Sequence, residues 1–441
     1  MALSRPNVVV MISHDTGRFI SPYGYDTVKT PNFEKLAEES VTFEEAYCTT
    51  PLCAPARSSL VTGLHHHQNG MMGLPADKLG GWDLKTKDRH LAAVFKGNGY
   101  HTVLCGFEHE TDDLFSVGFE EGIHGTGKGN NGGGSILGSG EDIEKWLEEN
   151  LETGTETPFN MQIGCGEVHR GWDQGPYKEK GIWNAPYLID DPVVDKEMAD
   201  LQGAVNDLDK GLGEIMDVFE KKGLTEDTIF VITTDHGIDF PRAKGTLFDP
   251  GVEVLLFMRY DGGDWSKGNR CEKLISQVDV YPTLLEACDI TVPENTAGNS
   301  FLHLLTGEQQ EDIRDAVFLE KTYHDNYDPM RGLRTERYKY VLNFDAQTLY
   351  DVRIATAPRY NWFKFPFNKE EREELYDLKE DPLETNNLAN NEEYDHIRRK
   401  LKKRLADWMQ KTEDPLLEGP IPSPYHLRIS KEMKNIASGK E

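Results

Sequence analysis

Apolar residues follow two different patterns along the N-terminal part of the chain. Continuous apolar runs that end in polar residues are typical of buried parallel strands. Such runs occur at Asn7–Ser13, Tyr100–Cys105, Phe159–Cys165 and Thr228–Thr234. Between them, Pro31–Glu39 and Asp195–Lys222 repeat apolar residues every three or four positions, which predicts amphipathic helices. This alternation predicts an α/β fold in which helices sandwich a large, mostly parallel sheet.

The pattern changes past residue 312, where the apolar runs become short and favour antiparallel strands. The candidate strands are Ala316–Glu320, Tyr338–Asn343 and Glu374–Leu378. A charged helix is expected over Glu392–Lys411. We therefore expect a large domain over residues 1–312 and a smaller α+β subdomain with an antiparallel sheet over residues 313–441.

The chain is strongly acidic. Its 441 residues include 76 acidic and 48 basic side chains, which gives a formal net charge of −28. This excess argues against a nucleic-acid-binding protein, which needs a basic surface. Small anionic ligands stay open, because a local group of cations outweighs distant surface charge.

The apolar runs and the cysteines bear on the compartment. The N-terminal apolar run is too short for a signal peptide, and no run is long enough to span a bilayer. Six cysteines are scattered without CxxC spacing, which argues against a disulfide framework and against a zinc ribbon. We expect a cytoplasmic protein without a membrane partner, or a periplasmic or secreted one whose export signal was removed. The sequence carries no signal for an oligomeric state.

The segment Cys53–Gly63 (CAPARSSLVTG) has the densest chemical pattern in the chain. Pro55 disfavours helical geometry at the residue before it, so we expect the helix to begin at or after Pro55. Cys53 would then lie on the loop before a helix N-terminus, where anions are stabilised. On these residues alone, Cys53 is either an ordinary cysteine beside a helix or a thiol nucleophile.

The whole of Cys53–Gly63 resembles the signature of the type I, formylglycine-dependent sulfatases of the alkaline-phosphatase-like superfamily, and the likeness covers nearly the whole chain. The resemblance implies that a formylglycine-generating enzyme oxidises Cys53 to formylglycine, whose hydrate attacks sulfur. It also implies that Arg57 holds the hydrate and that residues 1–312 form the catalytic domain.

Two further strand ends carry candidate metal ligands, Asp15 and the pair Asp235-His236. Each alone is equally typical of a turn or a helix cap, but strand carboxyl ends are where α/β sheets bind ligands. The resemblance implies that Asp15, Asp235 and His236, with His14 as a further candidate, hold one divalent metal ion. Calcium is the family default, whereas the imidazoles favour manganese or zinc.

The sulfate-contacting residues are assigned by the resemblance. His109 and His169 match family histidines of the active site, and His169 would protonate the leaving group. Lys244 matches the sulfate-binding lysine. Phe107 stands where the family carries another active-site lysine, so one expected cation is missing.

The segment Gly63–Leu74, together with Pro329-Met330-Arg331, resembles the heparan N-sulfatases within that family. This implies a small sulfated saccharide as substrate, with a sulfamate or sulfate ester on an N-sulfoglucosamine-like sugar. His67 and His324 are candidate sugar contacts. An acidic surface with a cationic pit favours a short saccharide bound end-on.

Two alternatives stay open. The pair Asp235-His236 and the lack of a lysine at position 107 also suggest a resemblance to the phosphonate monoester and phosphodiester hydrolases, which use the same formylglycine. Phe107 further motivates a catalytically inactive relic that only binds sulfated sugars.

Overall fold

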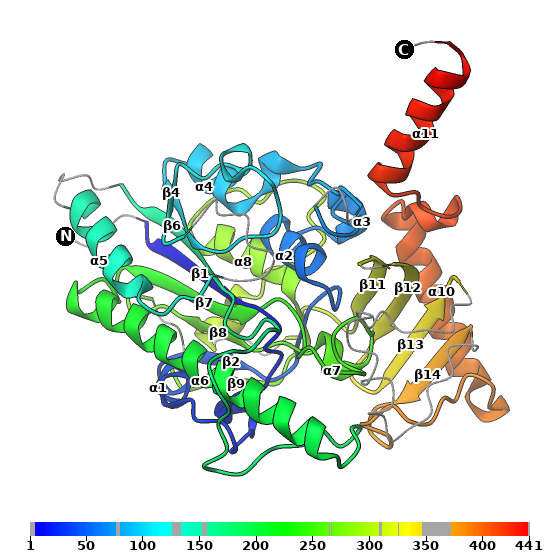
Figure 1. The fold of residues 1–441 in the computed structure, drawn as a ribbon, viewed down its shortest axis with the longest axis horizontal. Helices are drawn as coiled ribbons and strands as arrows, with labels where there is room; N and C mark the ends of the chain where they lie inside the picture. Colours follow the sequence, from blue (N-terminus) through cyan, green and yellow to red (C-terminus); the bar gives the residue numbers. More distant parts are fainter. Residues whose placement is uncertain are drawn as a thin grey trace.

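The computed structural model describes residues 5–75, 80–125, 134–151, 157–263, 265, 267–307, 311–324, 326–345 and 372–439. A large eight-stranded sheet and a separate four-stranded sheet lie side by side (Figure 1). The large sheet has the order β5 (Glu121–Ile123), β4 (His101–Gly106), β6 (Phe159–Cys165), β1 (Asn7–Ser13), β7 (Thr228–Thr234), β8 (Leu256–Arg259), β2 (Val41–Phe43) and β9 (Arg270–Cys271).

The five strands from β5 to β7 are parallel, whereas β8 runs antiparallel to both of its neighbours. Successive side chains of β1 point to opposite faces of the sheet, and all of them are buried. Both faces of the sheet are therefore covered at this strand. Val9 and Met11 face one core, and Val8, Val10 and Ile12 face another. The continuous apolar run of β1 is thus the pattern of a strand covered on both sides.

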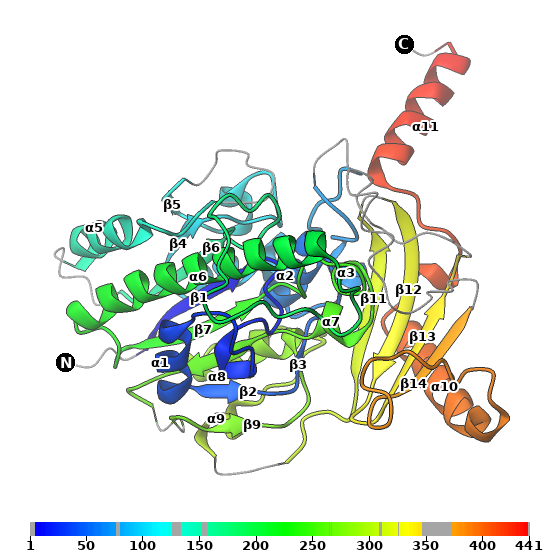
Figure 2. The same ribbon diagram turned by 60° about the horizontal axis from the view of Figure 1, so that its bottom comes forward.

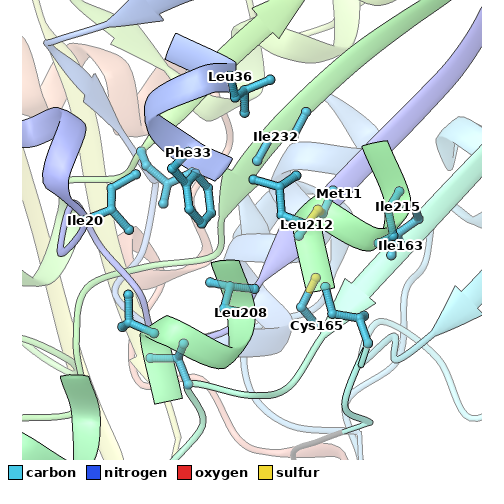
Figure 3. Close-up of a cluster of buried hydrophobic side chains, with 14 of the residues drawn as sticks. Met11, Ile20, Phe33, Leu36, Ile163, Cys165, Leu208, Leu212, Ile215 and Ile232 are labelled. Carbon is cyan, nitrogen blue, oxygen red and sulfur yellow. The ribbon is translucent and has the colours of Figure 1, made fainter. Parts of the chain in front are cut away.

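Helices cover the two faces, as the sequence predicts. One face carries α1 (Pro31–Glu39), α5 (Ser139–Leu151) and α6 (Pro192–Lys221). Figure 3 shows this core, where Leu208, Leu212 and Ile215 of α6 lie over Met11 and Ile232. The other face carries α2 (Cys53–Thr62), α4 (Leu91–Gly97) and α8 (Val280–Ala287).

Several shorter elements complete the fold. The strand β3 (Ala46–Tyr47) pairs with β10 (Ile275–Ser276). Three short helices are α3 (His66–Asn69), α7 (Asp249–Val252) and α9 (Leu302–Thr306). The predicted boundary at residue 312 lies between α9 and the first strand of the second sheet, and it stays a prediction. No helix in the described ranges combines the length and the apolar character that crossing a membrane requires.

The second sheet is antiparallel, with the order β11 (Val317–Tyr323), β12 (Tyr327–Arg334), β13 (Tyr338–Asn343) and β14 (Glu373–Asp377). It lies between the large domain and α10 (Asp395–Lys411) (Figure 2). The last helix, α11 (Pro424–Ala437), extends away from the body. The predicted fold class, α/β with a smaller C-terminal α+β part, is confirmed.

One predicted boundary is wrong. The helix α2 begins at Cys53 rather than at or after Pro55, so Cys53 is its first residue and not part of the preceding loop. The proline is tolerated because the first four N–H groups of a helix have no intrahelical partner. The side chain of Cys53 is therefore held by regular helical backbone.

Candidate active site

Two turns at the carboxyl ends of β1 and β7 are joined by hydrogen bonds. The backbone N–H of Asp15 donates to Asp235 Oδ1 (2.9 Å), that of Thr16 to Thr234 Oγ1 (3.1 Å) and that of Gly17 to the carbonyl of His236 (2.9 Å). Asp15 adopts a φ of 52°. This left-handed conformation costs a non-glycine residue about 1–2 kcal/mol. The hydrogen bonds between the two turns offset this cost, and the resulting turn geometry places Asp15 beside Asp235.

Five buried residues meet at these turns, and we call them the Cys53 cluster: His14, Asp15, Cys53, Asp235 and His236. Their ligand atoms all lie within 4.8 Å of one another. His236 Nδ1 donates to the carbonyl of Gly237 (2.9 Å), which turns Nε2 toward Cys53 Sγ (3.4 Å) and Asp15 Oδ1 (3.2 Å). Fixing the ring through its second nitrogen is how proteins orient a metal-binding histidine.

The second histidine of the cluster approaches both carboxylates. His14 Nδ1 lies 2.7 Å from Asp15 Oδ1 and 3.3 Å from Asp235 Oδ2. Burial alone would lower the pKa of His14, but the charges of Asp235 and Asp15 outweigh it and raise the pKa to about 10. The two carboxylates therefore stabilise the protonated form of His14.

Two buried cations flank the Cys53 cluster. Lys244 Nζ contacts both carboxylate oxygens of Asp15, at 2.7 and 2.9 Å. Arg57, fully buried on α2, donates from Nε to Asp235 Oδ2 (3.0 Å) and from Nη2 to the carbonyl of Ile12 (3.3 Å). Burial opposes ionisation of Asp15, yet Lys244 and then His14 hold its pKa well below the ordinary value.

Cys53 is itself in a cationic environment. Burial disfavours its thiolate, but the charges of Lys244 and His14 and hydrogen bonds from His109 and His14 bring its pKa well below the ordinary value. Atoms at the Sγ position are thus stabilised when they carry negative charge. This suits a nucleophile or an anionic group, whichever chemical form residue 53 takes.

His169 closes the site on another side. Its ring packs edge-on against His14, with 4.5 Å between the ring centroids, and its Nδ1 donates to the carbonyl of Arg170 (3.1 Å). Burial first, and then the charge of His14, lower the pKa of His169 to about 4. His169 is therefore neutral in the free protein near neutral pH.

Phe107 stands at the position where the family resemblance implies a lysine. The centroid of its ring lies 5.1 Å from the guanidinium carbon of Arg57. It lies 5.5 Å from the ring centroid of His14 and 5.3 Å from that of His109. The aromatic ring thus covers Arg57 in a cation–π contact. Position 107 supplies a wall that holds Arg57 where a second cation would repel it.

The sequence analysis missed Glu110, which is fully buried near Arg57. Burial raises the pKa of a carboxyl group, but the Arg57 charge outweighs burial and lowers that of Glu110. Its carboxylate accepts a hydrogen bond from the backbone N–H of His109 (2.9 Å), so it also positions that histidine's loop. Adjacency to His109 in the sequence was the available signal.

The structure brings together nine predicted site residues: Cys53, Arg57, His109, His169, Lys244, Asp15, Asp235, His236 and His14. The contacts of His67 are with other residues than these nine: its Nδ1 donates to Glu320 Oε2 (2.6 Å), and its ring packs on Trp408. His324 is buried directly after β11, where its backbone N–H donates to the carbonyl of Asn326. A sugar-contacting role for these two histidines stays a prediction.

Comparison with known proteins decides the family. The family model described as Sulfatase matches residues 6–290. The chain belongs to the sulfatase family. This sulfatase is accordingly a hydrolase of sulfate esters or sulfamates. A second model, described as N-sulphoglucosamine sulphohydrolase, C-terminal, matches residues 240–358 and 353–411.

Individual relatives cover nearly the whole sulfatase. It is 27% identical to human N-sulphoglucosamine sulphohydrolase over 95% of this chain and 92% of the relative. It is 29% identical to an ulvan-active sulfatase of Formosa agariphila over 95% and 83%. A structure solved in complex with its substrate, D-glucosamine-2-N,6-O-disulfate, has a TM-score of 0.75 at 18% identity and covers 95% of this chain and 99% of that one.

The same fold also occurs in the phosphonate monoester hydrolase of Agrobacterium radiobacter. That structure has a TM-score of 0.69 at 20% identity and covers 94% of this chain and 97% of the other. At this level of identity, the likeness concerns the fold alone. The sulfatase model rather than this neighbour therefore decides the reaction class.

Proposed function

We propose that this sulfatase removes sulfate from a short N-sulfoglucosamine-like saccharide, with a formylglycine made from Cys53 as its nucleophile. The observation that carries the proposal is the convergence of Lys244, His236 and His109 on Cys53 at the first residue of α2. The choice of sugar is supported by the human relative and by the C-terminal family model.

The Cys53 cluster fits one divalent metal ion. Asp15, Asp235 and His236 would hold it, with His14 as a fourth ligand, because their ligand atoms are buried and lie within 4.8 Å of one another. Mixed carboxylate and imidazole donors suit manganese or zinc at least as well as calcium. When bound, the ion supplies positive charge that polarises the sulfate oxygens. The formylglycine hydrate supplies the attacking oxygen.

The remaining residues bind the anion and move a proton. Lys244 and Arg57 supply fixed cations on two sides of residue 53, which stabilises charge that develops on the sulfate oxygens. Because His169 Nδ1 is engaged by a carbonyl, Nε2 is the atom that would deliver a proton to the leaving nitrogen or oxygen. An anionic substrate beside His169 raises its pKa toward the protonated form that a general acid needs.

The test uses the full chain coexpressed with a formylglycine-generating enzyme. Mass spectrometry of the Cys53 peptide should show the aldehyde, and Cys53→Ala should lose at least about 10⁴-fold in kcat. Cys271→Ala, a buried cysteine on β9, is the matched control and should keep full turnover. Full turnover by Cys53→Ala would refute the nucleophile.

A substrate panel of N-sulfoglucosamine, an aryl sulfate and an aryl phosphonate tests the specificity. The sulfamate or sulfate rate should dominate. A dominant phosphonate rate would refute the proposal in favour of the phosphonate hydrolase alternative. If protein that carries the aldehyde and a bound divalent ion turns over none of these substrates, the result would favour the catalytically inactive relic that only binds sulfated sugars.

A further inference from the structure

The strand β11 is the edge of the C-terminal sheet that faces the large domain (Figure 1, Figure 2). Its backbone is tied to the segment that leads into α2, since the N–H of Glu320 donates to the carbonyl of Thr49 (2.8 Å). The next residue, Lys321, is fully buried, although lysine is rarely fully buried unless it is paired. A buried ammonium group is costly without polar contacts, so the contacts of Lys321 indicate what it does.

Lys321 Nζ connects two parts of the molecule. It contacts Asp328 Oδ2 on β12 (2.8 Å), and it donates to the carbonyl of Gly245 (2.8 Å) in the turn that follows Lys244. The register between β11 and β12 shifts between Lys321 and Tyr323, and such an irregularity re-aims the side chains beside it. The carboxylate of Asp328 neutralises the ammonium group, so the turn receives a hydrogen bond from a pair without net charge.

The backbone of Gly245 is held from both sides. Its N–H donates to the carbonyl of Pro51 (3.0 Å), two residues before Cys53, and its carbonyl accepts from Lys321. Gly245 has a φ of 82°, a left-handed conformation that glycine adopts without steric cost but that its local preference does not fix. Contacts from outside the turn therefore set the path of the chain at Lys244, and the Lys321 contact makes the C-terminal sheet one source of them.

Lys244 is the cation whose placement depends on this turn. Its Nζ contacts both carboxylate oxygens of Asp15, at 2.7 and 2.9 Å. Phe107 stands where the resemblance implies a second lysine, so anion binding beside residue 53 depends the more on Lys244. A displacement of about 1 Å in such a group can cost up to about 10²-fold, even when its cause lies far from the reacting atoms.

We propose that Lys321, paired with Asp328, is a positioning residue for the sulfate site: it holds the carbonyl of Gly245 and thereby fixes Lys244 against Asp15. The C-terminal sheet in this way contributes to anion binding through a residue that acts on Lys244 rather than on the substrate. The inference rests on the part of the proposed function that assigns sulfate binding to Lys244. It is independent of the nucleophile and of the sugar.

Binding of inorganic sulfate to the full chain, measured by calorimetry, tests the inference without turnover. Lys321→Met should weaken sulfate binding about tenfold, and Lys244→Ala should weaken it at least as much. In the Lys244→Ala background, Lys321→Met should have no further effect, because the residue that it positions is gone. Lys339→Met, which removes another fully buried lysine of the same sheet, is the matched control and should leave the sulfate affinity of the folded protein unchanged.

A double variant separates positioning from folding. Lys321→Met alone removes the positive charge beside the buried carboxylate of Asp328, which lowers stability. Lys321→Met/Asp328→Leu removes both charges and should regain stability in urea unfolding. Sulfate binding by this double variant should stay about tenfold weaker, since the hydrogen bond to Gly245 is still missing. Sulfate affinity that returns together with stability would overturn the proposal, as would additive effects of Lys321→Met and Lys244→Ala.

The single variants tell this inference and the proposed function apart. If Lys244→Ala leaves sulfate binding unchanged, Lys244 does not bind the sulfate, and both the proposed role of Lys244 and the inference fail. If Lys244→Ala weakens sulfate binding and Lys321→Met does not, the proposed function stands and the inference alone is overturned.

Discussion

Two buried groups of histidines and carboxylates in this sulfatase have similar composition but opposite design. One is the Cys53 cluster. The other, which we call the Glu320 cluster, consists of His66, His67, Glu320, Arg331 and Asp414, and it joins α3 to the C-terminal sheet. In the Cys53 cluster the ligand atoms face one another, and the cations Lys244 and Arg57 lie at its edge.

In the Glu320 cluster a cation occupies the middle. Arg331 donates from Nε and Nη2 to Asp414 (2.5 and 3.1 Å) and lies 3.5 Å from Glu320 Oε2. The two carboxylates of this cluster therefore share one guanidinium, whereas Asp15 and Asp235 each pair with a separate cation at the edge of theirs. His67, Glu320 and Asp414 nevertheless satisfy the distances of a metal site. The comparison shows that residue types and spacing do not distinguish a reactive centre from a structural ion network. The position of the cations does.

The largest effect is expected on activity, when a carboxylate of the Cys53 cluster is replaced. Asp235→Asn removes a carboxylate charge from the Cys53 cluster while keeping the side-chain volume. Losing only a residue that orients a metal ligand typically costs about 10–100-fold, so this change should lower kcat/KM by at least about 10²-fold and reduce bound metal. Steady-state kinetics and metal analysis on one preparation measure both.

Asp414→Asn is the matched change in the Glu320 cluster. It should leave the kcat/KM of the folded protein and its metal content unchanged. Loss of metal on this change would mean that the Glu320 cluster, too, binds an ion, and the contrast between the clusters would fail.

The next effect is on stability. Arg331→Met leaves Glu320 and Asp414 buried without their cation, which typically costs about 3–5 kcal/mol. Urea unfolding should show this loss, and Arg331→Met/Asp414→Leu should recover part of it because one uncompensated charge is gone. An Arg331→Met protein of unaltered stability would show that the network is not structural.

The smallest effect concerns acid. Burial, only partly offset by Glu320, lowers the pKa of His66 to about 4 in the folded protein, against 6.5 when unfolded. Between these values the unfolded chain binds more protons, so the free energy of unfolding falls as pH falls. From about pH 7 to pH 5, His66 should contribute a loss of about 2 kcal/mol, whereas His66→Gln should lose that much less.

Urea unfolding at each pH measures this slope. His303→Gln, on α9 and only half-buried, is the control and should keep the slope of the unaltered protein. An identical slope for His66→Gln would show that another group causes the acid sensitivity.

The strands were the most predictable part of the fold. β1, β6 and β7 begin and end where the apolar runs do, because strands covered on both faces need apolar side chains at every position. β12 was missed because Pro329 interrupts its pattern. In the structure this proline lies near a register shift between β11 and β12, where a missing N–H group is tolerated.

The candidate site was predictable for a different reason. Asp235 directly follows one apolar run and Asp15 stands two residues after another, and parallel strands bring their carboxyl ends to the same edge of the sheet. The helix start at Cys53 was not predictable from Pro55, because a proline in the first turn is compatible with either start. The partner of Phe107 was also invisible, since Arg57 lies far from it in the sequence.

By itself, the sequence determined the long central strands β1, β4, β6 and β7 and the residue types at their ends, since these depend on local polarity and backbone preference. Only the tertiary structure decided that His66 and His67 face Glu320 and that Phe107 covers Arg57. Those choices depend on contacts between residues far apart in the chain, where burial and charge act through space and leave no pattern in the order of the residues.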